Sequence, residues 1–327
     1  MLFKLIGQFI MTAAIFQLLP ADAAYFEWQA GVGEFPVDFL YSEVAVAQIP
    51  VLPDAEDREV PEYPVKVDTD SYGIVTSAES ALVVDAVSGM TLLAKHPYQV
   101  RSIGSVTKLM SALVFMDTAP DLSQIVTLDP ALDLVEGGRV YLAFYDGLTL
   151  DDVLGASLVG SDNTATEALI RFSGLAKEDF VELMNQKAVE LGMIDTEFTD
   201  PTGIDPGNIS TASDLVKLLV AVEEIEILKK YMTTATLTVE HLSGRLVTIE
   251  NTNQLLESFL NEGEYEVTAG KTGYLPQAGY VLTSAVEQAG NKIYVIVLGS
   301  DSKESRVQEV KGLASWAFRV FKWPNSE

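Results

Sequence analysis

The sequence YVLTSAVEQAGNKIYVIVL, residues 280–298, decides the fold class of this chain. It contains two β-rich runs, Tyr280–Glu287 and Lys292–Leu298, joined by a short turn with glycine and asparagine. This pattern predicts an antiparallel hairpin. A third β-rich run, Glu266–Lys271, precedes the hairpin, and we therefore expect the last third of the chain to form an antiparallel meander.

The preceding segments are expected to complete this sheet and to cover it. Ala81–Val84 and Thr91–Ala94 flank a turn with Ser88-Gly89 and predict a second hairpin. Apolar residues at helical spacing then predict helices in these places: after Ser105, over Leu150–Val159 and Thr164–Phe172, up to Gly192, from Thr211 to Val222, and over Arg306–Phe321. The prediction is an α+β fold, an antiparallel sheet flanked by helices with a helical insertion.

Composition excludes several classes of function. The chain has 327 residues, 48% of them hydrophobic, and a net charge of −26, which argues against nucleic acid and anionic membrane surfaces as partners. Cysteine is absent, so thiol catalysis and Cys-ligated zinc are excluded. The two histidines, His96 and His241, form no H-e-x-x-H motif, and we interpret both as solvated. We therefore expect neither a metal site nor a cofactor.

The N-terminus is typical of an exported protein. Lys4 precedes the apolar run Leu5–Leu19, and Ala21-Asp22-Ala23 fits a cleavage site, so residues 1–23 are predicted to be a signal peptide. An uncleaved anchor is the alternative. Residues 24–75 are rich in proline and acids and predict an extended linker, followed by a catalytic domain over residues 76–322. We expect the protein in the cell envelope, periplasmic or extracellular.

Three short motifs follow one another along the chain: Ser105-Val106-Thr107-Lys108, Ser161-Asp162-Asn163 and Lys271-Thr272-Gly273. Each alone also describes an ordinary polar first turn, helix cap or strand end. Together, in this order, they describe one site in which serine is the nucleophile and lysine replaces the usual histidine. A second S-x-x-K, at residues 300–303, has neither partner motif after it, and we interpret it as a loop.

The chemistry of this site needs a neutral lysine. A serine hydroxyl becomes a good nucleophile only when a base takes its proton. Ser105 and Lys108 are three residues apart, so they share one face of a helix and can touch. Burial and a nearby cation, such as Lys271 in the same cleft, lower a lysine pKa toward neutrality.

The other motif residues suit supporting roles. The hydroxyl of Ser161 can relay a proton between Lys108 and a leaving amine, and Asn163 can hold Lys108 and a substrate amide at once. In the third motif, Lys271 and Thr272 are expected to bind a carboxylate, and Gly273 is expected to leave space for a substrate along the strand. The N–H groups of Tyr274 and Ser105 are expected to donate hydrogen bonds to the oxyanion.

These motifs resemble those of the D-alanyl-D-alanine carboxypeptidases, the low-molecular-mass penicillin-binding proteins of the S11 serine peptidase family. The resemblance covers about residues 75–320. It includes the opening hairpin, the nucleophile segment Ile103–Met110, the loop Asp200–Asp205 followed by Ser210–Asp214, and Ala278-Gly279-Tyr280 after K-T-G. It implies a β-lactamase/transpeptidase-like fold.

The resemblance also implies roles and partners. Ser105 would be the acyl-ester nucleophile, Lys108 the proton acceptor, Ser161 catalytic and Lys271 a substrate binder, with Arg306 a candidate for the terminal carboxylate. Asn163, Thr272 and Tyr274 would support them. The substrates would be peptidoglycan stem peptides ending in D-Ala-D-Ala, and β-lactams would be covalent inhibitors.

Some features depart from the family pattern and leave alternatives open. Asp162 stands where the family usually has glycine. A D,D-endopeptidase that cuts peptidoglycan cross-links would use the same site. A class A-like β-lactamase would need a deacylating glutamate, and Glu197 lacks the E-x-x-L-N setting of one. An inactive envelope binding protein is a further alternative, which the intact serines and lysines disfavour.

Overall fold

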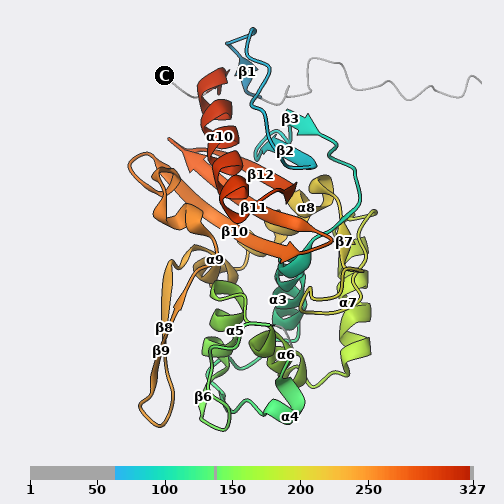
Figure 1. Cartoon of the computed structure of the whole chain (residues 1–327), viewed down its shortest axis with the longest axis vertical. Helices are drawn as coiled ribbons and strands as arrows, with labels where there is room; N and C mark the ends of the chain where they lie inside the picture. Colours follow the sequence, from blue (N-terminus) through green and yellow to red (C-terminus); the bar gives the residue numbers. More distant parts are fainter. Residues whose placement is uncertain (1–62, 136–137, 325–327) are drawn as a thin grey trace, which may run out of the picture. The chain divides into compact units, whose positions relative to one another are not determined.

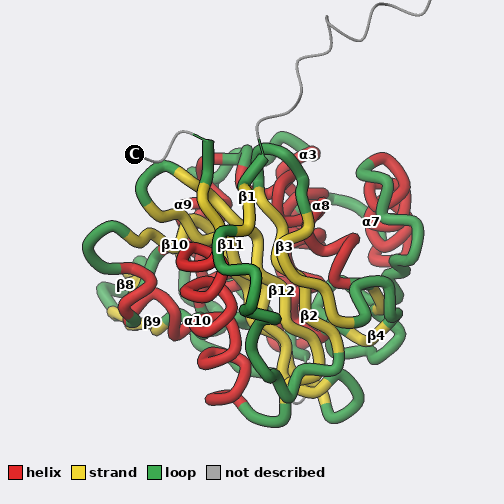
Figure 2. Tube along the Cα trace, turned by 90° about the horizontal axis from the view of Figure 1, so that it is seen from above, coloured by secondary structure: helices red, strands yellow, loops and turns green. Residues whose placement is uncertain are grey.

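A five-stranded antiparallel sheet organises the fold. The structure is a computed structural model that describes residues 63–135 and 138–324. The strand order in the sheet is β10-β11-β12-β2-β3, and every neighbouring pair is antiparallel (Figure 2). The strands are β2 (Ser80–Asp85), β3 (Thr91–Lys95), β10 (Tyr265–Leu275), β11 (Gly279–Gln288) and β12 (Asn291–Ser300). The predicted hairpins and meander are confirmed.

The sheet is buried on both faces, which explains its nearly continuous hydrophobic strands. Along β12, Val295 and Val297 belong to one core cluster, while Ile296 and Leu298 belong to the other. This alternation follows from the two-residue period of a strand. Helix α10 (Lys303–Val320) covers the first face and crosses in front of the sheet in Figure 1.

The second face is covered by the helical insertion between β3 and β10 (Figure 1). Its helices are α3 (Thr107–Asp117), α4 (Pro130–Asp133), α5 (Leu150–Val159), α6 (Asn163–Phe172), α7 (Lys177–Glu190), α8 (Ala212–Glu223) and α9 (Glu226–Thr233). Thr149 and Asp152 form a complete capping box at α5. At α8 Thr211 accepts the N–H of Asp214 as expected. The α+β prediction with a helical insertion is therefore confirmed.

Several short strands escaped the sequence pattern. They are β4 (Arg101–Ser102) with β7 (Ile209–Ser210), β5 (Ile125–Val126) with β6 (Leu148–Thr149), and the hairpin of β8 (Thr236–Glu240) and β9 (Leu246–Glu250). The hairpin of β8 and β9 is mostly exposed, and each of its strands buries a single residue. A two-residue strand or an exposed ribbon carries too little hydrophobic periodicity to be recognised.

The expected boundary of the catalytic domain at residue 76 falls too late. Strand β1 (Val65–Lys66) pairs with β13 (Phe321–Lys322), and the N–H of Val67 donates to the carbonyl of Val320 at 2.8 Å. The indole N–H of Trp316 donates to Ser71 Oγ at 2.8 Å. The end of the predicted linker therefore belongs to the folded domain. The predicted signal peptide and residues 24–62 lie outside the described residues.

Among the residues that the structure describes, no helix has the length and apolar character needed to cross a bilayer.

The contacts of β1 predict a measurable contribution to stability. A chain beginning at residue 73 loses the β1–β13 pairing and the Ser71–Trp316 hydrogen bond, compared with a chain beginning at residue 63. Each lost hydrogen bond typically costs about 1 kcal/mol, so the shorter chain should melt several degrees lower, at roughly 2–4 °C per kcal/mol. Differential scanning calorimetry of both chains measures this difference. Equal melting temperatures would contradict a structural role for β1.

Candidate active site

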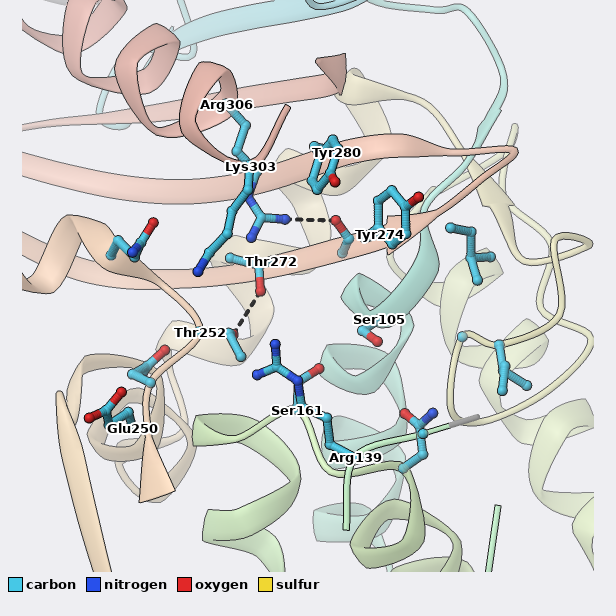
Figure 3. A pocket seen from close by; sticks show the side chains of 18 of the residues that line it. Ser105, Arg139, Ser161, Glu250, Thr252, Thr272, Tyr274, Tyr280, Lys303 and Arg306 are labelled. Carbon is cyan, nitrogen blue, oxygen red and sulfur yellow. Dashed lines mark hydrogen bonds between the residues drawn. The ribbon is translucent and has the colours of Figure 1, made fainter. Parts of the chain in front are cut away.

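The three motifs meet at one cavity of about 500 Å³. Ser105, Ser161, Asn163, Thr272, Gly273 and Tyr274 all line it, and Figure 3 shows the labelled ones around it. They come from the start of α3, from the break between α5 and α6, and from strand β10. Segments more than one hundred residues apart in sequence thus converge as the motif order predicted.

Ser105 sits in a 3-10 turn, η3 (Gly104–Val106), that leads directly into α3. At this turn the backbones touch. A Cβ atom at Gly273 would lie 2.3 Å from the Ile103 carbonyl oxygen, and one at Gly104 would lie 3.0 Å from the Tyr274 nitrogen. Gly273 is therefore required by the turn that carries Ser105, whereas we had expected it to make room for substrate. The close approach brings the backbone nitrogens of Ser105 and Tyr274 near each other.

Lys108 is fully buried and has three partners. Its Nζ lies 3.2 Å from Ser105 Oγ and 2.5 Å from Asn163 Oδ1, and it also contacts the carbonyl oxygen of Thr202. The amide and carbonyl oxygens can only accept hydrogen bonds, so they take the two N–H groups of a neutral amine. The lone pair of that amine then faces the hydroxyl of Ser105.

Burial lowers the pKa of Lys108 to about 7, against the opposing charges of Asp200 and Asp162. The predicted contact between Ser105 and Lys108 is thus present, in the environment that the chemistry needs. Near neutral pH a large share of the Lys108 amine is unprotonated.

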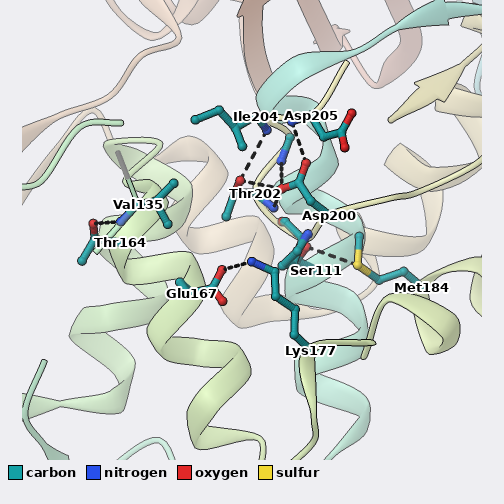
Figure 4. A network of polar contacts seen from close by, with 12 residues as sticks. Ser111, Val135, Thr164, Glu167, Lys177, Met184, Asp200, Thr202, Ile204 and Asp205 are labelled. Carbon is teal, nitrogen blue, oxygen red and sulfur yellow. Dashed lines mark hydrogen bonds and ion pairs between the residues drawn. The ribbon is translucent and has the colours of Figure 1, made fainter. Parts of the chain in front are cut away.

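A loop held by Asp200 supplies the third partner of Lys108 (Figure 4). The Asp200 carboxylate accepts hydrogen bonds from the Thr202 N–H and hydroxyl, both at 2.6 Å, and from Asn208 Nδ2 at 2.6 Å. It also accepts from the N–H groups of Gly203 and Asp205. Burial opposes ionisation of Asp200, but these hydrogen bonds outweigh it and keep the pKa of the carboxyl below its ordinary value. The loop therefore presents the Thr202 carbonyl rigidly.

The Ser161-Asp162-Asn163 motif is both a helix cap and part of the site. Asp162 is the N-cap of α6 and accepts the N–H of Ala165 at 2.9 Å and of Tyr141 at 2.8 Å. Ser161 has a positive φ of 59°, a conformation that is rare outside glycine. This turn directs Ser161 and Asn163 into the cavity. Asp162, which stands where the family usually has glycine, thus has a structural role, because its carboxylate joins the start of α6 to the segment at Tyr141.

The hydroxyl of Ser161 has a different partner from the one we expected. Lys271 Nζ donates to Ser161 Oγ at 2.9 Å and to the Thr272 carbonyl oxygen at 3.2 Å. The expected link of Ser161 to Lys108 is thus replaced by one to Lys271. Burial lowers the pKa of Lys271 well below its ordinary value, and the charges of Lys108, Arg306 and Arg139 lower it further. An anion entering the cavity would relieve this repulsion and raise the pKa of Lys271 again.

Arg306 forms a wall of the cavity and is 5% exposed. Its Nη1 donates to the carbonyl oxygens of Gly273 at 2.8 Å and Val281 at 3.2 Å, and its guanidinium lies 5.6 Å from the ring centre of Tyr280. Burial lowers the pKa of Arg306 to about 10. Arg306 therefore holds strand β10, while its buried Nε–H has no partner among the described residues.

The cavity residues that were missed from the sequence include Arg139, Thr252 and Lys303. Thr252 Oγ1 accepts a hydrogen bond from Thr272 Oγ1 at 2.7 Å, and it belongs to no recognised motif. Lys303 ends the second S-x-x-K, which is the turn from β12 into α10. From the sequence we interpreted that turn as a loop. Only the positive charge of Lys303 could have indicated that this residue belongs to the cavity. Within the described residues, no group of side chains could hold a metal ion.

Comparison with known proteins agrees with this geometry. A model of the Peptidase S11 family, described as D-alanyl-D-alanine carboxypeptidase, matches residues 67–302. A D-alanyl-D-alanine endopeptidase of Pseudomonas aeruginosa is 32% identical over 241 residues, which cover 72% of this chain and 76% of that protein.

Solved structures show the same fold. The DD-transpeptidase of Streptomyces K15 superposes with a TM-score of 0.70 at 26% identity, over 76% of this chain and all of that chain. Penicillin-binding protein D2 of Listeria monocytogenes, in its cefotaxime-bound form, gives 0.65 at 26% identity, also over 76% of this chain and all of that chain.

Fold and site together define a serine hydrolase of the penicillin-binding class, with a buried lysine in contact with a serine of the cavity. The chain belongs to the Peptidase S11 family and is a serine-type D-Ala-D-Ala peptidase.

The surroundings of Lys108 predict a lysine that titrates near neutrality. In protein labelled with ¹³C-lysine, one side-chain signal should change its shift with a midpoint near pH 7, whereas an ordinary lysine titrates near 10.5. The amine is protonated below this midpoint and neutral above it. The signal should disappear in Lys108→Arg, which identifies it. A Lys108 signal with a midpoint near 10.5 would contradict the neutral amine.

Proposed function

We propose that this protein is an exported D-Ala-D-Ala carboxypeptidase that removes the terminal D-alanine from peptidoglycan stem peptides through an acyl-enzyme at Ser105. The observation that carries the proposal is the contact between Ser105 Oγ and the buried amine of Lys108 at 3.2 Å. Family membership supports the substrate class. The predicted signal peptide, residues 1–23, supports export.

Acylation begins when Lys108 takes the proton of Ser105. Ser105 Oγ attacks the carbonyl carbon of the penultimate D-alanine, and the oxyanion receives hydrogen bonds from the N–H groups of Ser105 and Tyr274. The C–N bond then breaks, and the leaving amine takes up the proton that Lys108 removed from Ser105, which returns Lys108 to its neutral form. Ser161, whose hydroxyl accepts a hydrogen bond from Lys271, lies beside the leaving nitrogen. Water hydrolyses the ester in the second step, again with Lys108 as the base.

The substrate lies along strand β10 in this mechanism. β10 is at the edge of the sheet, so an extended peptide can add beside it. Asn163 holds Lys108 and a substrate amide. Lys271 and Thr272, with the guanidinium of Arg306, receive the terminal carboxylate. These cations make a local positive site in a protein of net charge −26.

A second candidate function, cleavage of peptidoglycan cross-links, is favoured by the relative from Pseudomonas aeruginosa, which is named an endopeptidase. It needs the same nucleophile, base and oxyanion donors. The class A β-lactamase alternative is weaker, because the backbone of Glu197 pairs with Ile209 and its side chain is not among those that line the cavity. The penicillin-binding relative supports β-lactams as covalent inhibitors.

The base role of Lys108 predicts that arginine cannot replace it. Lys108→Arg keeps the positive charge but cannot release a proton, so its acylation rate should fall as far as that of Lys108→Ala, roughly 10²- to 10⁴-fold. Stopped-flow acylation by a β-lactam measures both rates. Lys177→Arg, on an exposed ion pair, serves as the control and should acylate like the wild type. Substantial acylation of Lys108→Arg would show that Lys108 acts only as a cation.

Product analysis tests the proposed reaction directly. The protein is incubated with a stem pentapeptide and with a cross-linked muropeptide, and the products are identified by mass spectrometry. Release of D-alanine from the pentapeptide is expected, together with a penicillin adduct on the intact protein that Ser105→Ala abolishes. Cleavage of the cross-link alone would favour the endopeptidase. The absence of both products and of the adduct would overturn the proposal.

A further inference from the structure

The hydroxyl of Thr272 is bonded to a neighbour that belongs to none of the three motifs. Thr272 Oγ1 donates to Thr252 Oγ1 at 2.7 Å, and Figure 3 shows this hydrogen bond at the cavity. Both residues line the cavity, and Thr272 is 4% exposed. A hydroxyl has a single proton to donate. In this arrangement the proton of Thr272 is given to Thr252 and is not available to a substrate.

The segment that carries Thr252 has a fixed position between the second and third motifs. The N–H of Thr252 donates to the Val159 carbonyl at 3.1 Å, at the end of α5 and directly before the turn at Ser161. A Cβ atom at Gly270 would lie 2.5 Å from Asn253 Nδ2, so the segment also lies against strand β10. The hydroxyl of Thr252 is therefore held beside Thr272 by contacts of the main chain on either side.

The hydroxyl of Thr272 depends on Thr252 for its orientation. Within residues 63–135 and 138–324, Thr252 is the only hydrogen-bond partner of Thr272 Oγ1. Lys271 Nζ is bonded to Ser161 Oγ and to the main-chain carbonyl of Thr272, and Arg306 is bonded to carbonyls of the sheet. Neither cation therefore contacts the Thr272 hydroxyl.

The proposed substrate requires the opposite direction of this hydrogen bond. A carboxylate can only accept hydrogen bonds, so Thr272 must donate its proton to the terminal carboxylate in the complex. The oxygen of Thr272 is then free to accept a hydrogen bond from Thr252. Because Thr252 also has a hydroxyl, it can turn its own proton toward Thr272 when the carboxylate binds. The two oxygens keep their places, and only the direction of the hydrogen bond is reversed.

We propose that Thr252 is a positioning residue that orients the hydroxyl of Thr272 toward the terminal carboxylate of the substrate. Thr252 donates to Thr272, and Thr272 donates to the carboxylate. Hydrogen bonds in such a chain polarise and strengthen one another, so Thr252 adds to carboxylate binding without touching the substrate. The inference rests on the proposed function, because that function places a free carboxylate at Thr272.

The test compares a peptide that ends in D-Ala-D-Ala with the same peptide carrying a C-terminal amide. Release of the last residue by the full chain gives kcat/KM for both peptides, in the wild type and in Thr252→Val, which keeps the shape of threonine without its hydroxyl. The variant should lose roughly two- to ten-fold on the acid, the typical effect of one neutral hydrogen bond, mainly through a higher KM. The amide should lose less, because Thr272 donates a weaker hydrogen bond to a neutral oxygen.

Three further variants separate orientation of Thr272 from a merely structural role. Thr252→Ser keeps a hydroxyl and should retain the wild-type ratio of acid to amide. Thr252→Ala lacks the hydroxyl and should give the same lowered ratio as Thr252→Val. Thr248→Val makes the same chemical change on the exposed side of β9, outside the cavity lining, and should keep the wild-type ratio. Formation of the penicillin adduct reports that each variant is folded.

An equal loss on acid and amide in the variants without the hydroxyl, or an unchanged ratio, would overturn the role of Thr252 and leave the proposed function intact. A Thr252→Ser variant with the ratio of Thr252→Val would also overturn that role. Absence of D-alanine release by the wild type would overturn the proposed function, and the inference with it.

Discussion

The burial of one lysine amine is the constraint on which this site depends. Moving the pKa of Lys108 from 10.5 to about 7 makes its protonation less favourable by roughly 5 kcal/mol, at about 1.4 kcal/mol per pKa unit. The fold provides this environment by surrounding the amine with the side chain of Asn163 and the carbonyl of Thr202. With its two N–H groups bonded to these oxygens, the neutral amine turns its lone pair toward Ser105. A solvated lysine at the same position would keep its proton and could not act as a base.

The sheet and its glycines set the distances within the site. Strand β10 passes so close to the nucleophile turn that a side chain at Gly273 or Gly104 would collide with backbone atoms. Gly203 meets the same turn from the other side, since a Cβ there would lie 2.1 Å from the Gly104 carbonyl oxygen. Because main chains touch directly, the positions of Ser105 and Tyr274 do not depend on flexible side chains. Arg306 reinforces this arrangement through the carbonyls of β10 and β11.

Charge is distributed in the opposite sense inside and outside the cavity. The chain as a whole has a net charge of −26, yet Lys271, Arg306, Arg139 and Lys303 gather at the site. Burial lowers the pKa of Lys271, and the charges of Lys108, Arg306 and Arg139 lower it further. A bound carboxylate neutralises this repulsion, and binding of an anionic substrate is thereby coupled to the protonation of Lys271. The surrounding acidic surface disfavours anions elsewhere on the protein.

The sequence by itself determined the five strands of the main sheet, most of the helices and the three motifs, because two- and 3.6-residue periodicities and short spacings are local properties. Ser105 and Lys108 could be paired from their separation of three residues alone. Only the tertiary structure decided the contacts between residues that are far apart in the sequence. Ser161 is hydrogen-bonded to Lys271, and Gly273 lies against the backbone of the turn that carries Ser105. Strand β1 pairs with β13. The tertiary structure also brought Thr252 and Lys303 into the cavity. These outcomes depend on how segments far apart in the chain pack together, and no local pattern of residues encodes that.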